Sequence, residues 1–389
     1  VHAGWGFLAE NAAFARRVID AGLTWIGPPP DVIGRLGDKI EAKQIARAAN
    51  VPVIPGIDHV TEAEQVRRWM REESVSFPVM LKAAGGGGGR GMVKVEHDAH
   101  LHMAIGQARS EAKKFFGSGT VLAEKYVERG RHIEVQIIAD AHGNVVHLYE
   151  RECTIQRRHQ KIVEEAPSPT LDTQLREEIC ATAVRLMREI GYASAGTVEF
   201  LFDSETRRFY FLEVNTRLQV EHGITELITG VDIVSLMLDV AEGKPLPFCQ
   251  EEIRPNRWAL EVRLNAEDPR SFNPSFGSIS RLIVPQGPNV RVASGVYEGA
   301  DVPPYYDSLL MLVISAGKDR ADAISVMDRC LGRNLRVEGV KTLQPLLLSI
   351  IRHPAFVAGE FSTRFIEEHL AELVATFRER IPEDEVLKV

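Results

Sequence analysis

A run of five glycines, Gly85 to Gly89, most constrains how this chain folds, and Gly91 follows two residues later. The run lies between two apolar stretches typical of short strands, 77–83 and 92–95. Glycine has no Cβ, so the backbone N–H groups of such a loop can surround a phosphate at close range. Lys82, just before the run, could reach that phosphate as a point charge.

This glycine loop does not match the two common nucleotide-binding fingerprints. It does not end in Lys followed by Ser or Thr, as the Walker loop does, and it leads into a strand instead of the helix of a dinucleotide-binding motif. Two interpretations remain. The loop is either a flexible surface hairpin or a lid that closes over a triphosphate.

The spacing of apolar residues along the chain predicts an α+β protein, with helices and strands in separate and alternating stretches. Helices are expected at 7–22, 38–49, 175–190 and 361–380. Strands are expected at 23–27, 77–83, 92–95, 121–126, 133–139, 145–149, 197–202 and 209–214.

Length and charge exclude several classes of protein. A chain of 389 residues has room for two or three domains. Its net charge of -8 argues against a nucleic-acid partner, and no apolar run approaches the ~20 residues that span a membrane. The four cysteines have no C-x-x-C spacing and none lies beside a cluster of histidines, which argues against zinc and against a disulfide framework. A reducing compartment is expected.

Two lone acids in apolar strands predict a metal site. Glu199 and Glu213 lie in the expected hairpin of 197–202 and 209–214, and Asn215 is two residues beyond Glu213, on the same face. Buried acids are costly unless they are paired or bound to a cation, and three oxygen ligands suit Mg²⁺. The alternative is that both glutamates form salt bridges with basic residues such as Lys82.

The same alternation continues beyond Asn215. If residues 215–222 stay extended, Arg217, Gln219 and Glu221 share its face. Arg217 and Gln219 could then hold a small anion, with Glu221 as a base. The alternative is the polar outer face of an edge strand.

A basic, histidine-bearing segment, 150–161, allows two interpretations as well. It is either a solvated charged face or a positive wall for phosphate and bicarbonate. His132 alone is more typical of a structural histidine, and it gains interest only from its context.

Together these segments resemble the biotin carboxylase family. The resembling stretches occur in the family's order and cover nearly the whole chain: 2–11, 37–39, 81–91, 124–126, 131–136, 156–161, 213–222, 261–268 and 304–308. The resemblance implies an α+β, ATP-grasp fold. The end of an N-terminal α/β domain would occupy 1–36, the ATP-grasp domain 37–255 with a mobile lid at about 53–127, and the biotin carboxylase C-terminal domain 256–389. The earlier part of the first domain is expected to precede Val1.

The resemblance also implies a ligase that forms a C–N bond, carboxylating biotin with ATP and bicarbonate through a carboxyphosphate intermediate. It assigns Mg²⁺, with Mn²⁺ as an alternative, to Glu199, Glu213 and Asn215. It implies that nucleotide and bicarbonate contacts come from Lys39, Lys82, Gly86, Gly87, Gly88, Glu124, Lys125, Val127, His132, Gln156, His159, Gln219 and Val220. It implies catalytic roles for Arg217 at bicarbonate, Glu221 as its base, Lys161 at the transferring phosphoryl group and Arg263 at the biotin enolate.

Partners follow from what the sequence lacks. It contains no Ala-Met-Lys-Met-like segment that carries biotin and no evident carboxyltransferase domain. A biotin carboxyl carrier protein or domain and a carboxyltransferase are therefore expected, in a homodimer or larger complex in the cytoplasm (or in the mitochondrial matrix of a eukaryote). The final acceptor stays open among acetyl-CoA, propionyl-CoA and pyruvate. A different ATP-grasp carboxylate–amine ligase and a non-catalytic scaffold are the competing hypotheses.

Three departures from the family pattern point to a divergent branch. Gly223 and Phe276 stand where the family usually has proline, and the stretch 309–315 has no lysine. A flexible turn at Gly223 is expected to loosen the position of Glu221.

Overall fold

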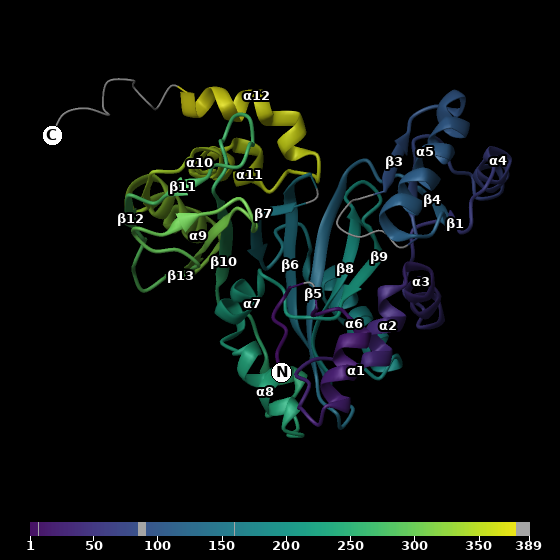
Figure 1. The fold of residues 1–389 in the computed structure, drawn as a ribbon, viewed down its shortest axis with the longest axis horizontal. Coiled ribbons are helices and arrows are strands. Elements are labelled where there is room, and N and C mark those ends of the chain that lie inside the picture. Colours follow the sequence, from purple (N-terminus) through teal and green to yellow (C-terminus); the bar gives the residue numbers. More distant parts are fainter. Residues whose placement is uncertain (7, 85–90, 159, 379–389) are drawn as a thin grey trace. The chain divides into compact units, whose positions relative to one another are not determined.

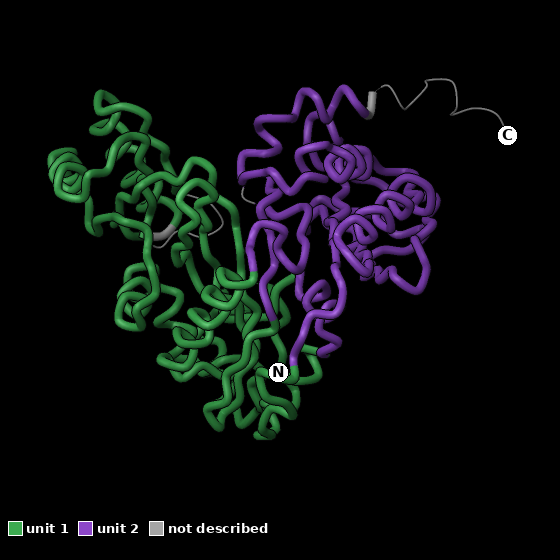
Figure 2. The backbone as a smooth tube through the Cα atoms, turned by 180° about the vertical axis from the view of Figure 1, so that it is seen from behind, with its two compact units in different colours: residues 1–148, 173–220, 232–252 green, residues 149–172, 221–231, 253–389 purple. Residues whose placement is uncertain are grey.

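The computed structural model describes residues 1–6, 8–84, 91–158 and 160–378. The chain divides into two compact units, coloured green and purple in Figure 2. Unit 1 comprises 1–148, 173–220 and 232–252, and unit 2 comprises 149–172, 221–231 and 253–389. The mixture of helices and strands confirms the α+β class, whereas the domain ranges expected from the resemblance stay predictions. None of the helices in the described ranges has the length and apolar composition needed to cross a lipid bilayer.

Unit 1 holds most of the N-terminal half of the chain, which is coloured purple to teal in Figure 1. Its elements are α1 (Ala12–Asp20), α2 (Pro30–Gly37), α3 (Lys39–Ala48), β1 (Gly56–Ile57), α4 (Ala63–Glu72), β2 (Val79–Ala83), β3 (Met92–Val95), α5 (Asp98–Phe116), β4 (Val121–Lys125), β5 (Gly130–Ala139), α6 (Thr173–Glu189), β8 (Ser194–Asp203), β9 (Arg208–Asn215), α8 (Ile233–Ala241) and the short helix η1 (Gln250–Glu252).

A small antiparallel sheet in unit 1 has the strand order β1-β4-β2-β3. Strand β2 alternates, so Val79, Leu81 and Ala83 are buried in a core that also contains Trp69 of α4 and Leu101 of α5. Lys82 therefore points to the opposite face. The predicted strands on both sides of the glycine run are confirmed, and residues 85–90 lie outside the described residues.

A second group of antiparallel strands in unit 1 runs in the order β5-β8-β9. Every residue of β5 is buried, and α6 and α8 pack against this group. The register places Glu134 opposite Glu199, and Glu199 opposite Glu213. The predicted hairpin of 197–202 and 209–214 is thus confirmed.

Unit 2 contains the remaining elements. They are the later part of β6 (Val145–Arg157, in unit 2 from residue 149), β7 (Gln160–Ala166), α7 (His222–Thr229), β10 (Trp258–Asn265), β11 (Gly277–Ser278), β12 (Arg281–Ile283), β13 (Val290–Ser294), β14 (Asp301–Val302), β15 (Leu309–Gly317), α9 (Arg320–Arg329), a π-helical turn η2 (Cys330–Asn334), β16 (Arg336–Glu338), α10 (Gln344–Arg352), α11 (Pro354–Ala358) and α12 (Phe365–Arg378).

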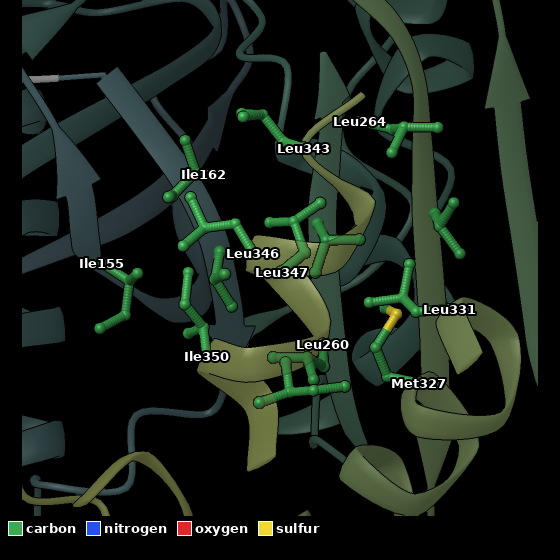
Figure 3. Packing of buried hydrophobic residues seen from close by; sticks show 14 of the residues in the cluster. Ile155, Ile162, Leu260, Leu264, Met327, Leu331, Leu343, Leu346, Leu347 and Ile350 are labelled. Atoms are coloured by element: carbon green, nitrogen blue, oxygen red, sulfur yellow. The ribbon is translucent and has the colours of Figure 1, made fainter. Parts of the chain in front are cut away.

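The strands of unit 2 follow the order β13-β15-β10-β7-β6. Their apolar side chains meet the apolar faces of α9 and α10 in the core of this unit (Figure 3). Leu346, Leu347 and Ile350 of α10 lie in this core with Leu260 and Leu264 of β10. Burying each such side chain contributes about 1.5–3 kcal/mol, so this core fixes β10 and β7 firmly.

Three predicted elements differ from the structure. The helix expected at 7–22 begins at Ala12, because the side chain of Asn11 accepts a hydrogen bond from the Phe14 N–H (2.8 Å) and caps it there. The strand expected at 23–27 is reduced to a single bridge between Ile26 and His2. Strand β6 continues past its predicted end at 149 to Arg157, because its polar residues are buried in the sheet.

Candidate active site

Three glutamates on neighbouring strands form a carboxylate row in unit 1: Glu134 on β5, Glu199 on β8 and Glu213 on β9. Glu134 is fully buried, and Glu199 is 6% exposed. Burial, followed by repulsion from Glu199, raises the pKa of Glu213, although Lys39 opposes this shift with its Nζ 3.6 Å from Glu213 Oε2. The row thus concentrates negative charge that a cation would neutralise.

Other predicted residues surround this row. His132 Nε2 lies 3.2 Å from Glu199 Oε2 and 3.4 Å from Glu134 Oε2. The Gln219 amide donates a hydrogen bond to Glu199 Oε1 (3.2 Å). The structure therefore brings His132 and Gln219 to the row, whereas the sequence predicted only that Glu199 and Glu213 lie opposite each other.

Asn215 ends β9 beside the row, pairing with Thr197 across the hairpin. Its Oδ1 accepts a hydrogen bond from Arg217 Nη2 (2.8 Å), and Arg217 Nε lies 3.0 Å from Glu10 Oε2. The side chains of Glu199, Glu213 and Asn215 offer carboxylate and amide oxygens as metal ligands, and such ligands suit Mg²⁺. The residues present therefore fit a hard cation.

Glu124 is the centre of a buried ion cluster on β4. It pairs with Lys43 of α3 and, at 2.5 Å, with Lys82 Nζ of β2. Burial by itself raises the pKa of Glu124, but Lys82 and Lys43 outweigh burial and lower this pKa to about 2. Lys82 thus has a carboxylate partner, but that partner is Glu124 and neither Glu199 nor Glu213.

Lys43 was missed by the sequence analysis. It is 6% exposed and lies one helical turn after Lys39 on α3. Two lysines four residues apart on one helix share a face, and that spacing could have identified Lys43. Of the neighbouring predicted residues, Lys125 donates its backbone N–H to Pro55 O (2.9 Å), and Val127 is buried.

The segment 215–222 does not stay extended. Strand β9 ends at Asn215, Val220 lies in a turn, and Glu221 is the N-cap residue of α7 (φ -79°, ψ 8°). The predicted alternation of Arg217, Gln219 and Glu221 on one strand face is therefore wrong. Gln219 belongs to unit 1, where it donates a hydrogen bond to Glu199, and Glu221 belongs to unit 2.

Glu221 lies between two cations in unit 2. Its Oε1 accepts a hydrogen bond from Lys161 Nζ at 2.7 Å, and its Oε2 accepts one from Arg263 Nη2 at 2.9 Å. The Nε of Arg263 donates to Glu164 Oε1 at 2.6 Å, so the guanidinium bridges two carboxylates. Three predicted catalytic residues, Lys161, Glu221 and Arg263, are thus in contact.

Burial opposes the charge of Arg263, but Glu164, Glu221 and Glu261 outweigh burial and raise the pKa of this guanidinium. Burial, partly offset by Arg263, raises the pKa of Glu164 to about 7. Burial and then repulsion from Glu164 raise the pKa of Glu261 well above its usual value. The cluster therefore holds carboxyl groups that resist ionisation.

Glu164 and Glu261 were missed by the sequence analysis, which used only the position of Arg263. Both glutamates are fully buried, and neither oxygen of Glu261 accepts a hydrogen bond from the described residues. The E-V-R spacing of 261–263 places Glu261 and Arg263 on one face of β10, which was the available signal.

The interpretation of segment 150–161 as a solvated charged face is wrong for its first part. Residues 150–155 are buried, and Arg151 donates to the Thr225 hydroxyl at 3.0 Å. The Gln156 amide donates to Cys153 O (2.9 Å), and Arg157 Nη2 lies 2.6 Å from Glu267 Oε2. His159 and the predicted loop glycines Gly86, Gly87 and Gly88 lie outside the described residues.

Gly223 does not form the flexible turn that the sequence suggested. It is buried in the first turn of α7, where an added Cβ would lie 2.6 Å from Ile314 Cδ1. The stretch 309–315 is strand β15, buried after its first residue, so a lysine there would need a buried partner. Phe276 is 51% exposed, and nothing in the structure explains why it is not proline.

Family models match most of the chain. The model "Carbamoyl-phosphate synthase L chain, ATP binding domain" matches residues 38–249, "Biotin carboxylase C-terminal domain" matches 261–368, and "Biotin carboxylase, N-terminal domain" matches 1–33. The fold and the carboxylate row thus define an ATP-dependent ligase of the ATP-grasp class.

Relatives identify the family within that class. The chain is 48% identical over 370 residues to biotin carboxylase of Halalkalibacterium halodurans, covering 95% of this chain and 81% of the relative. It is 45% identical over 370 residues to biotin carboxylase of Pseudomonas aeruginosa, covering 95% and 82%. The chain belongs to the biotin carboxylase family.

Solved structures agree with this assignment. The biotin carboxylase domain dimer of 2-oxoglutarate carboxylase from Hydrogenobacter thermophilus, in complex with MgADP, ADP and bicarbonate, matches with a TM-score of 0.91 and 44% identity, over 96% of this chain and 82% of that one. Biotin carboxylase from Campylobacter jejuni matches with a TM-score of 0.90 and 43% identity, over 94% and 81%. These matches confirm the predicted ATP-grasp fold.

Proposed function

We propose that this chain catalyses the ATP- and bicarbonate-dependent carboxylation of biotin, the first half-reaction of a biotin-dependent carboxylase. One observation carries the proposal beyond family membership. Glu221 places one carboxylate oxygen on Lys161 and the other on Arg263, and all three side chains are at least partly shielded from water. A carboxylate held at both oxygens has a fixed orientation, as a general base requires.

Residues of unit 1 would bind the nucleotide and the metal ion. Glu199, Glu213 and Asn215 would hold Mg²⁺, which when bound neutralises charge on the nucleotide phosphates. Lys39, Lys82 and His132, with Gly86, Gly87 and Gly88, would contact those phosphates, and Glu124, Lys125 and Val127 would line the adenine site. Because Lys82 pairs with Glu124, the same carboxylate would also orient this lysine toward the nucleotide.

The roles in the bicarbonate chemistry are proposed residue by residue, from the match to the family pattern. Arg217, Gln219 and Val220 would bind bicarbonate, with Gln156 and His159 adding to the anion site. Glu221 would accept the bicarbonate proton while a bicarbonate oxygen attacks the γ-phosphorus and ADP leaves. Lys161 would steady the transferring phosphoryl group.

The resulting carboxyphosphate would break down to CO₂ and phosphate. Phosphate would then take the proton of the biotin ureido nitrogen, and Arg263 would stabilise the enolate that attacks CO₂. Arg263 suits this role because its pKa is raised, so it stays a cation throughout.

Partners follow from this half-reaction. Biotin has to arrive on a carrier protein or domain, and a carboxyltransferase has to consume carboxybiotin. A homodimer or a larger carboxylase complex is part of the proposal, supported by the dimer of the Hydrogenobacter domain. The final acceptor depends on the transferase, and the cytoplasmic location stays a prediction.

The test is bicarbonate-dependent ADP release from the full chain, with and without free biotin. We expect biotin to stimulate the release, and we expect Glu221→Gln to reduce it by about 10²–10⁴-fold, the contribution of a general base. Arg263→Ala should abolish the stimulation by biotin. Glu242→Gln, at the exposed end of α8, is the matched control and should behave as wild type.

Two outcomes would overturn the proposal. ATP turnover that is indifferent to biotin would leave a different ATP-grasp carboxylate–amine ligase. Failure of the folded full chain to bind MgATP would favour a non-catalytic scaffold.

A further inference from the structure

Two histidines and a glutamate meet at the C-terminal helices of unit 2, outside the candidate active site. His353 lies at the junction of α10 and α11, and His369 and Glu372 lie three residues apart on α12. Figure 1 shows α12 running beside α10 and α11, and α10 and α12 are in contact. One donor atom from each residue lies within 4.8 Å of the other two. We call these residues the C-terminal histidine cluster.

The separations in this cluster suit a tetrahedral ion. Glu372 Oε2 lies 3.4 Å from His353 Nε2 and 3.6 Å from His369 Nδ1. Zinc binds nitrogen and carboxylate oxygen at about 2.0–2.2 Å, so ligand atoms at two corners of a tetrahedron are ~3.3–3.6 Å apart. Two of the three edges therefore already have the length that a bound ion requires.

The surrounding packing holds both imidazoles in place. The Phe365 ring packs beside both, with its centroid 5.2 Å from that of His353 and 5.0 Å from that of His369, and the two imidazole centroids are 4.4 Å apart. His353 is 8% exposed, and its Nε2 is buried without a hydrogen-bond partner among the described residues. This ring nitrogen faces Glu372 Oε2 at 3.4 Å without hydrogen-bond geometry, so an ion held between the two atoms would satisfy both.

The other two side chains open the cluster to solvent. The side chain of His369 is 31% exposed and that of Glu372 is 64% exposed. An ion could therefore enter from the outside, and water could supply the fourth ligand.

We propose that the C-terminal histidine cluster binds one divalent transition-metal ion of the zinc class, through His353 Nε2, His369 Nδ1 and a Glu372 oxygen. The chemistry favours Zn²⁺, Co²⁺ or Ni²⁺ over Mg²⁺, because imidazole suits the former and Mg²⁺ prefers an all-oxygen shell. The ion would join α12 to the α10–α11 junction and act as a structural staple.

One local bond has to change when the ion binds. His353 Nδ1 accepts a hydrogen bond from the Ala355 N–H and caps α11. Ligation through Nε2 places the ring proton on Nδ1 and removes this acceptor. The bond is long, 3.3 Å, and Pro354 at the start of α11 already favours the helical turn, so the loss is small beside two metal–nitrogen bonds.

The test is a zinc titration of the metal-stripped full chain against a chromophoric chelator, in excess Mg²⁺ to occupy the oxygen site. We expect one zinc equivalent per chain and a rise in Tm on adding zinc. His369→Gln and His353→Asn should each weaken zinc binding more than about tenfold and remove the rise in Tm. Asparagine can still cap α11, so His353→Asn separates metal binding from capping.

Two controls localise the ion. His100→Gln removes a histidine from the other close histidine pair, on α5, and Cys249→Ser removes the exposed cysteine. Both variants should keep the zinc equivalent, and Co²⁺ in place of zinc should show d–d absorption without a thiolate charge-transfer band. Wild type that binds no zinc, or a His369→Gln/Glu372→Gln double variant that binds zinc as wild type does, would overturn the proposal. The Tm of each variant without metal verifies its fold.

Discussion

Glu164 and Glu261 lie directly opposite each other on strands β7 and β10, and both side chains are fully buried. Two buried carboxyl groups that face each other cannot both ionise cheaply. Of these two glutamates, only Glu164 accepts a hydrogen bond from Arg263 among the described residues. Burial is the main cause that raises the pKa of both glutamates, and repulsion from Glu164 adds to it at Glu261. The protonation of Glu164 therefore depends on pH near neutrality.

The first prediction concerns Glu164→Gln, which removes the charge and keeps the size of the side chain. The pKa of Glu164 rises from 4.5 to about 7 on folding, so the folded state keeps a proton that the unfolded state has lost. The contribution of Glu164 to stability is present below pH 4.5 and is lost as pH rises to about 7. Urea unfolding across this window should show wild type losing stability relative to the variant as pH rises.

The control for this experiment is Glu189→Gln on α6, where the residue is exposed. Its stability should follow that of wild type across the pH range. A constant difference between wild type and Glu164→Gln at all pH values would contradict the raised pKa.

The second prediction concerns Glu124→Gln. The change leaves Lys43 and Lys82 without their shared carboxylate, and Lys43 is 6% exposed. Breaking a buried ion pair costs about 3–5 kcal/mol, so the variant should unfold at markedly lower urea concentration. The exposed neighbour Glu128→Gln should change stability by less than about 0.5 kcal/mol, and equal effects of the two substitutions would refute the buried cluster.

The third prediction concerns the magnesium requirement. Glu199→Gln removes the negative charge of one ligand and Asn215→Ala removes an oxygen ligand, so half-maximal ADP release should need at least about tenfold more Mg²⁺ in each variant. Removing Mg²⁺ with a chelator should stop release in wild type. Glu205→Gln, exposed in the turn of the same hairpin, should leave the Mg²⁺ dependence unchanged. Unchanged dependence in Glu199→Gln would remove this residue from the metal site.

The fourth prediction concerns Leu347→Ala in the core of unit 2. Leu347 is fully buried on α10 (Figure 3), so truncation leaves a cavity and should cost about 2–5 kcal/mol of unfolding free energy. Val357→Ala, at a site that is 52% exposed on α11, should cost less than about 0.5 kcal/mol. Similar losses in the two variants, measured by urea unfolding, would argue against a tightly packed core.

Local sequence patterns predicted the strands of the site well. The alternation around Glu199 and Glu213 identified their hairpin, because each strand is fixed by its own apolar residues. The same alternation failed after Asn215, since Glu221 begins a helix whose position depends on contacts with distant strands. The alternation of side chains between two faces predicts their direction only within the strand, and β9 ends at Asn215.

Partners distant in sequence could not be predicted at all. Glu124 and Lys43 are 81 residues apart, and Glu164 and Arg263 are 99 apart. Such pairs depend on strand order and register, which no local pattern contains. The resemblance to a known family supplied Lys161 and Arg263 but neither Glu164 nor Glu261, the buried glutamates beside Arg263.

The path of the chain between the two units limits where this polypeptide can be cut. Each unit is assembled from three separate stretches, and Glu221 is the first residue of one of them. Strand β10 pairs with β7, so a gene fragment that starts at 253 would encode β10 without the neighbour encoded about 90 codons earlier. Splitting the gene at that point should therefore give two fragments that recover structure only when they are expressed together.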